Sequence, residues 1–252
     1  MQLDDITRLA WEVRHYGAVG DGIVDDTAAL QLAIDRSNAG GGGRVLVSAG
    51  TYRCGTIELR TNVELHLAPG SRLIADPEHA ADLVVMRGQH NVAITGSGLI
   101  DGGDAARAAV VITDCDDVDL RGPTLAGGLA DGIGVEIAGS RGVTIDGCRL
   151  RVAGTGLELR AGSEAGECRD LIIANSHLGS SRVAIRVGGP VRRSVFNGLV
   201  IGNCGVGVEF GAGPAEQLRF AELIIGADVP LLWTGDAPNG SITFAGLSVA
   251  GR

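Results

Sequence analysis

Several features that mark common protein classes are scarce or absent in this sequence. Aromatic residues make up only 3% of the chain, and no stretch approaches the roughly 18 consecutive apolar residues of a membrane helix. The N-terminal segment MQLDDITRLAWEVRHYG has neither a basic region nor an apolar run, so it does not predict a signal peptide. We therefore expect a cytoplasmic protein with no membrane partner.

Positive charge is also in short supply. The chain has 21 Lys and Arg residues against 30 Asp and Glu residues, which gives a formal net charge of −9. No basic stripe interleaved with aromatic residues offsets this balance. An acidic chain repels phosphate backbones, so the sequence argues against nucleic acid as a partner.

Cysteines are few and scattered. Their number is odd, and they form neither a Cys-x-x-Cys pair nor a Cys/His set at metal-ligand spacing. The five positions are Cys54, Cys115, Cys148, Cys168 and Cys204. We expect these residues to be small buried hydrophobes, and we expect neither a metal nor a cofactor.

The chain does contain an internal repeat. Short segments that alternate apolar and polar residues and end at Gly or Asn recur at intervals of about 22–29 residues. The segments are NVELHL (62–67), NVAITG (91–96), DVDLRG (117–122), GVTIDG (142–147), DLIIANS (170–176) and LRFAELIIG (218–226). This period predicts an all-β parallel β-helix of about 8–9 coils, with aliphatic side chains stacked inside.

The N-terminal part differs from the repeat. Asp25 and Asp26 precede Thr27, and apolar residues then follow at helical spacing, which predicts an N-capped helix. Because the end of a solenoid exposes core residues, this helix is expected to cap it. With no linker visible, we expect one domain over residues 1–252: cap and first coil at about 13–60, and repeating coils over 61–252.

Two stretches carry a family resemblance. GDGIVDDTAALQLAID followed by GGGRVLVSAGTY resembles the opening of the pectate-lyase-like right-handed parallel β-helix superfamily. NVELHLAPGSRLIA and NVAITGSGLIDG are similar to family-28 glycoside hydrolases, the polygalacturonases. The resemblance implies a right-handed parallel β-helix with a carbohydrate cleft on one face.

The resemblance also implies four catalytic motifs, NTD, DD, GHG and RIK, on successive coils. At the matching places we find Thr155 for the first Asp, Ser180 and Ser181 for the Asp pair, Val206 for the His, and 231–234 without a cation. Because Ser and Thr cannot act as the acid or base at neutral pH, the ordinary polygalacturonase mechanism is not expected here. Thr155 and Ser181 remain candidate substrate-binding residues.

A different set of residues occupies the same face. Glu136, Glu158 and Glu209 each sit between inward apolar residues, so they should point outward. Glu158 and Glu209 are expected two coils apart, with Cα atoms about 10 Å from each other, near the separation of an inverting acid/base pair. Arg160 and Arg186 are expected one coil apart in a neighbouring column, as anion binders.

Other interpretations stay open for these and further residues. Alternating Glu and Arg columns also suit a solvated solenoid face with no catalysis. Asp131 is a further candidate catalytic carboxylate, although Asp-Gly is a common turn pair, and Trp233 is a candidate for stacking on a sugar ring or for core packing. The acids of TDCDDVDL (113–120) suggest a calcium site, but a turn is the favoured interpretation.

Three functions remain in view. The first is an enzyme acting on a carbohydrate or uronate-like substrate, which predicts a concave groove and a Glu with a raised pKa. The second is a small-molecule lyase, epimerase or cyclase in the old cleft, and the third is a noncatalytic binding or assembly module. SITFAGLSVAGR (241–252) has no evident polar cap, which predicts a homo-oligomer through the C-terminal coil.

Overall fold

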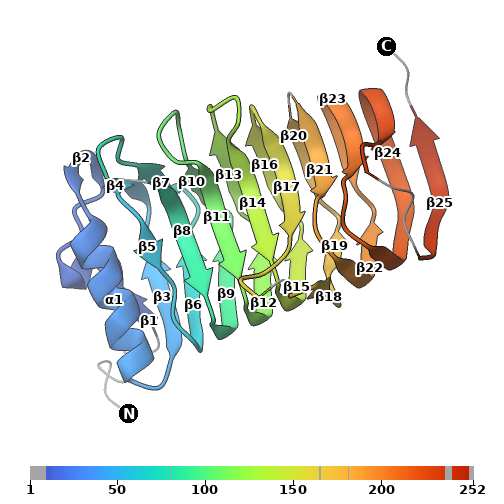
Figure 1. The fold of residues 1–252 in the computed structure, drawn as a ribbon. Helices are drawn as coiled ribbons and strands as arrows, with labels where there is room; N and C mark the ends of the chain where they lie inside the picture. The colour runs from blue at the N-terminus through green and yellow to red at the C-terminus, as the bar shows by residue number, and fades with distance from the viewer. Residues whose placement is uncertain (1–9, 80, 165, 181, 236–239, 250–252) are drawn as a thin grey trace.

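The chain forms a parallel β-solenoid of about nine coils, shown in Figure 1. The structure is a computed structural model that describes residues 10–79, 81–164, 166–180, 182–235 and 240–249. All described strand pairings are parallel, and each strand pairs with the equivalent strand one coil away. The predicted fold class is confirmed.

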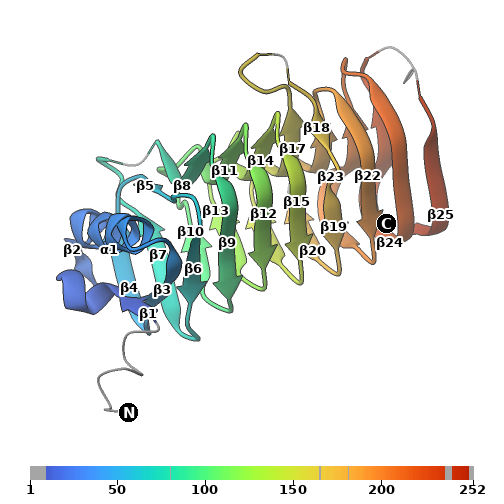
Figure 2. The same ribbon diagram turned by 90° about the horizontal axis from the view of Figure 1, so that it is seen from below.

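Three strips of strands, named faces A, B and C, run the length of the molecule (Figures 1 and 2). Face A comprises β5 (Ile57–Glu58), β8 (Asp82–Arg87), β11 (Ala108–Thr113), β14 (Ile133–Ala138), β17 (Thr155–Arg160), β21 (Val183–Val187), and the later parts of β23 (Val200–Phe210) and β24 (Ala215–Trp233). Face B comprises β1 (Ala10–Glu12), β3 (Gly43–Val47), β6 (Val63–Leu67), β9 (His90–Gly96), β12 (Asp116–Arg121), β15 (Arg141–Asp146), β18 (Cys168–Arg169), β19 (Ile172–Ala174), β22 (Val191–Asn197), the start of β24, and β25 (Ile242–Val249). Face C comprises β2 (Asp21–Asp25), β4 (Gly50–Cys54), β7 (Ser71–Ala75), β10 (Leu99–Asp101), β13 (Thr124–Gly127), β16 (Arg149–Val152), β20 (His177–Ser180), and parts of β23 and β24.

The core consists of columns of like side chains. One inward column of face B contains Val45, Leu65, Ile94, Leu120, Ile145, Ile173, Phe196, Phe220 and Phe244. The rings of Phe196 and Phe220 stack at a centroid distance of 4.4 Å, and those of Phe220 and Phe244 at 5.0 Å. The core is thus aliphatic as predicted over most coils, and the four phenylalanines of the chain lie in the last ones.

The backbone conformation at the corner where a face B strand begins explains the recurring Asn, Asp and Gly. Asn62, Asn91, Asp117 and Asp170 all have left-handed backbone conformations, with φ between 52° and 62°. Asn and Asp tolerate this conformation better than other residues with a side chain, because their short polar groups bond locally. The Asn91 side-chain amide also donates a hydrogen bond of 2.9 Å to the Asn62 oxygen one coil below.

The predicted cap is present at the N-terminal end. Helix α1 (Thr27–Ala39) follows a short 3₁₀ helix, η3 (Val13–Tyr16), and buries Leu30 and Ile34 against the first coil. Of the two acids predicted at the start of the helix, Asp25 accepts the N–H of Thr27 at 2.9 Å, whereas Asp26 accepts the N–H groups of Val19 and Gly20 at 2.6 and 3.0 Å. Asp26 therefore anchors the loop before β2.

All five cysteines are buried, as expected. Burial raises the pKa of the Cys54 thiol to about 12 and that of Cys148 to about 11. These thiols are therefore protonated packing groups at neutral pH. In the part of the chain that the structure describes, no helix has the length and apolar character needed to cross a membrane.

Candidate functional site

The three predicted glutamates lie in one outward column of face A. Paired strand by strand, this column contains Glu58, Val85, Val111, Glu136, Glu158, Arg186, Glu209 and Leu232. Glu158 and Glu209 are two coils apart, as predicted. The prediction that Arg160 and Arg186 share a neighbouring column is wrong, because Arg186 lies between the two glutamates and Arg160 is the partner of Ala138.

Arg186 joins the two glutamates unequally. Its Nε and Nη2 atoms lie 3.2 and 3.1 Å from Oε2 of Glu209, which makes a close two-point contact. Its Nη1 atom lies 4.0 Å from Oε2 of Glu158, which is beyond hydrogen-bonding distance. Both glutamate side chains are only about one-sixth exposed, at 15% and 16%. The guanidinium of Arg186 thus lies between two partly buried carboxylates. Among the described residues, no carboxylate lies within hydrogen-bonding distance of its Nη1 atom.

Glu136 has a more enclosed environment. Its side chain is 8% exposed and contacts Arg107 at 2.6 Å and Arg160 at 3.0 Å. Burial raises the pKa of Glu136, but the hydrogen bonds and charges of Arg107 and Arg160 outweigh burial and place it below the usual value. The expectation of a raised glutamate pKa is therefore wrong for Glu136, which suits a permanent carboxylate rather than a general acid.

The remaining candidates on this face do not join Glu158 and Glu209. Asp131 lies in the turn before β14, is highly exposed, and forms an ion pair with Arg182. Thr155 is buried and is in register with Ile133, which packs with Val85 and Val111 outside the main core, so Thr155 lies on the outward side of face A. Ser181 lies outside the described residues.

Trp233 lies on the core side of face A at the end of β24, where it is 41% exposed. It is in register with Phe210, whereas Leu232 is in register with Glu209. The Trp233 and Phe210 rings stack with centroids 4.6 Å apart. Because alternate residues of a strand point to opposite sides, Trp233 continues the aromatic core and is not positioned beside the glutamate column.

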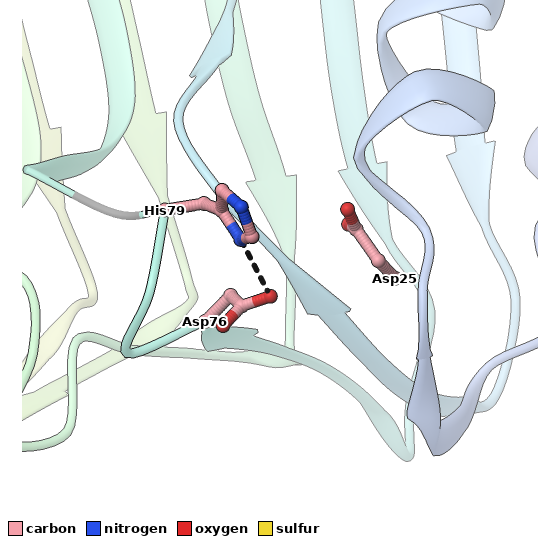
Figure 3. Close-up of side chains that lie close together, drawn as sticks. All are labelled: Asp25, Asp76 and His79. Atoms are coloured by element: carbon pink, nitrogen blue, oxygen red, sulfur yellow. Dashed lines mark hydrogen bonds and ion pairs between the residues drawn. The ribbon is translucent and has the colours of Figure 1, made fainter.

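A cluster that sequence reasoning missed lies at the N-terminal end, shown in Figure 3. Oxygens of Asp25 and Asp76 and a ring nitrogen of His79 lie within 4.8 Å of one another, a donor set that a small cation could use. Asp76 is buried, and its pKa is lowered first by a hydrogen bond from the backbone N–H of Glu78 and then by one with the side chain of His79. The positive charge of Arg53 lowers the pKa of Asp76 further, and the two hydrogen bonds hold the turn after β7.

The acidic segment 113–120 behaves as a turn and strand. Asp116 pairs with Arg141, and Asp119 pairs with Arg121 at 2.9 Å. Asp114 has a left-handed backbone and accepts a hydrogen bond from the Ser163 side chain. These carboxylates point to different partners and do not converge on a cation site, which agrees with the favoured interpretation.

Comparison with known proteins places this geometry in a family context. A segment of the chain is 43% identical over 63 residues to the mannuronan C5-epimerase AlgE1 of Azotobacter vinelandii, which covers 22% of this chain and 4% of that protein. Another comparison gives 37% identity over 70 residues to an exo-poly-alpha-D-galacturonosidase of Dickeya chrysanthemi, covering 28% of this chain and 11% of that protein. The chain thus spans only a small part of the length of either relative.

The fold is shared more widely than the sequence. A hyperthermoactive exopolygalacturonase from Thermotoga maritima superposes with a TM-score of 0.71 at 16% identity, over 95% of this chain and 80% of that one. Residues 10–215 match the family described as "Rhamnogalacturonase A/epimerase, pectate lyase-like". This match covers most of the solenoid, from β1 to the start of β24. The chain therefore belongs to the rhamnogalacturonase A/epimerase family of pectate-lyase-like proteins.

Proposed function

We propose that this chain binds and modifies a uronate-containing polysaccharide on face A, at Glu158, Arg186 and Glu209. The observation that carries this proposal is the unequal sharing of Arg186, which contacts Glu209 closely and leaves its Nη1 atom 4.0 Å from Glu158. A substrate carboxylate is the planar anion that a guanidinium edge binds best. A uronate inserted between Arg186 and Glu158 would sit directly beside two carboxylate bases.

The chemistry that fits this arrangement is proton removal next to the substrate carboxylate. Glu158 or Glu209 would take the proton from the ring carbon that bears the carboxylate. The negative charge then spreads onto the carboxylate oxygens, where Arg186 stabilises it. Return of a proton to the opposite face gives the epimer, whereas departure of the linkage oxygen on the adjacent carbon gives an unsaturated uronate.

The family and its relatives support a uronate over a neutral sugar. The family description joins a rhamnogalacturonase with an epimerase. The two relatives above are described as acting on mannuronan and on polygalacturonate. Glu136, fixed as a carboxylate by Arg107 and Arg160, does not supply the protonated acid that glycoside hydrolysis needs. This favours proton abstraction over hydrolysis at face A.

The test is a turnover assay with mannuronate and galacturonate oligomers in deuterated water. Deuterium at the ring carbon reports epimerisation, ultraviolet absorbance of an unsaturated end reports elimination, and new reducing ends without either report hydrolysis. Glu158→Gln and Glu209→Gln should each lower the rate at least about 100-fold, the usual contribution of a general base. Glu216→Gln, which removes an equivalent ion-paired glutamate on face B, is the matched control and should keep the rate.

Two other functions are distinguished by the same assay. A noncatalytic binding module is favoured by the ion pairs that hold Glu136 and Glu209, since these pairs neutralise the column internally. It predicts oligomer binding with no turnover in the wild type. A small-molecule enzyme predicts turnover of uronate monomers or other small molecules but not of oligomers. Turnover that survives both glutamine substitutions would contradict the proposed site.

A further inference from the structure

The outward side of face C gathers arginines that the proposed site does not use. Arg72 lies on β7, Arg149 and Arg151 lie on β16, and His177 lies beside Arg149 on β20. All four side chains are exposed. Since Arg149 and Arg151 are two residues apart on one strand, they point to the same side of the sheet, about 6.6 Å apart along it.

These arginines have no carboxylate partner among the described residues. The ion pairs of the molecule hold arginines on faces A and B, as for Arg186 with Glu209 and Arg141 with Asp116, and none involves Arg72, Arg149 or Arg151. An acid on the same outward strip, Asp101, lies two coils from Arg151 and accepts the Gly103 N–H at 3.0 Å. In a chain of net charge −9, this strip is a local excess of positive charge.

The surface between the arginines is hollowed. Two adjoining hollows of about 290 and 410 Å³ share Arg151 in their walls. The first also contacts Arg149, His177 and Asn203, and the second reaches Arg72. Gly179 and Gly202 follow Arg151 in its column, so no side chain rises from the floor there. The two hollows lie one after the other along face C with Arg151 in both walls, and together they are named the groove.

The spacing suits a ligand with repeated charges. Arg72 and Arg149 lie in one column, separated by Leu99 and Thr124, and are therefore three coils or about 14 Å apart. A single compact anion cannot reach both positions, whereas carboxylates repeated along an oligosaccharide can. The described residues that line the groove include no Phe, Tyr or Trp, the large aromatic side chains on which nucleic acid bases commonly stack.

We propose that this groove on face C is a second carbohydrate site that binds an acidic oligosaccharide through Arg72, Arg149 and Arg151. It lies on a different face from Glu158, Arg186 and Glu209, and it requires no reaction there. Guanidinium groups would hold successive carboxylates, with the chain running along the solenoid axis. Binding through exposed charges should weaken as salt concentration rises.

The test is calorimetric titration of the full chain with a mannuronate hexamer and dimer, with neutral maltohexaose and with a single-stranded DNA hexamer. Arg149→Gln/Arg151→Gln should weaken hexamer binding about tenfold or more, which corresponds to loss of at least one charged hydrogen bond. Arg72→Gln should weaken the hexamer about threefold and leave the dimer unchanged, since only the longer ligand spans three coils. Arg219→Gln, which removes an exposed arginine from face B, is the matched control and should bind normally.

The outcomes separate this groove from the reaction on face A. Hexamer binding that is absent in the wild type, or unchanged in Arg149→Gln/Arg151→Gln, would overturn the groove. Equal binding of maltohexaose would overturn the role of charge, and equal binding of DNA would overturn the carbohydrate preference. Glu158→Gln should keep groove binding even where it abolishes turnover. A thermal melt of each variant confirms folding, and Arg151→Gln alone serves if the double variant is unstable.

Discussion

Faces A and C have the same parallel backbone and the same stacking of coils, yet they use arginine in opposite ways. On face A, Arg186 lies between Glu158 and Glu209, so its charge is met within the column. On face C, the column of Arg149 continues with Thr124 on one side and His177 on the other. The residue one coil away therefore decides how much of the charge of an arginine is already balanced before a ligand binds.

The depth of burial follows the same division. The Glu136 carboxylate is enclosed and holds two arginines, whereas Arg149 and Arg151 stand in solvent. A charge that is enclosed needs its partner, because an uncompensated buried charge is costly, while an exposed charge needs none. The enclosed ion pairs of Glu136 should therefore matter for folding, and the exposed arginines of face C should matter for binding.

The sharpest test of this contrast is to remove one arginine from each face. Arg107→Gln takes away the cation shared by Asp82 and Glu136, whose side chains are 11% and 8% exposed. We expect the free energy of unfolding to fall by about 2 kcal/mol, below the full cost of a buried pair because Arg107 itself is partly exposed. Arg149→Gln should change it by less than about 0.5 kcal/mol. Urea unfolding of both variants measures the two changes in the free energy of unfolding. Equal losses in Arg107→Gln and Arg149→Gln would contradict the difference between faces A and C.

A smaller effect should appear in the pH dependence of stability. The pKa of Glu136 is lower in the folded protein than its ordinary value of 4.5, so its ion pairs stabilise the fold above that value. This stabilisation is lost as the pH falls through the lowered folded pKa. Between pH 6 and about pH 3, Glu136→Gln should therefore lose less stability than the wild type. Parallel unfolding curves for the two proteins would contradict the ionised state of Glu136.

The smallest effect on stability comes from converting face C to the pattern of face A. His177 is in register with Arg149, so His177→Glu places a carboxylate directly beside that arginine. Thermal unfolding should show a gain of about 0.2–1 kcal/mol from the new cross-strand pair. Binding of the mannuronate hexamer should fall about tenfold, while His177→Gln, the uncharged control, should keep most of it. Undiminished hexamer binding in His177→Glu would break the proposed link between pairing and ligand binding.

Much of the architecture could be predicted from local pattern. The alternation in segments such as NVAITG predicted strands, and the left-handed corners at Asn62, Asn91 and Asp117 account for the Asn or Asp that begins these segments. The outward direction of Glu158 and Glu209 was predicted correctly for the same reason, since side chains alternate along a strand.

The neighbour of each outward charge could not be predicted in the same way. The sequence alignment of GLELRAG with SSRVAIRVGG put Arg160 opposite Arg186. In the structure, the residue in register with Arg186 is Glu158. A slip of two residues keeps every side chain on its correct side, so the apolar pattern does not detect it. The coil from Glu136 to Glu158 is 22 residues long, and the next coil, from Glu158 to Arg186, is 28 residues long. Because the turns differ in length from coil to coil, a constant repeat length does not predict which residues are in register.

The sequence by itself determined the repeat, the inward and outward sides of the strands, the capping helix and the burial of the cysteines. These depend on local alternation, turn residues and hydrophobicity, which act over a few neighbouring residues. Only the tertiary structure decided that Arg186 lies between two glutamates, that Asp76 and His79 meet Asp25, and that Arg149 has no acid beside it. The physical reason is that charges interact over a few ångström, and in a solenoid those few ångström separate residues that are a whole coil apart in the chain.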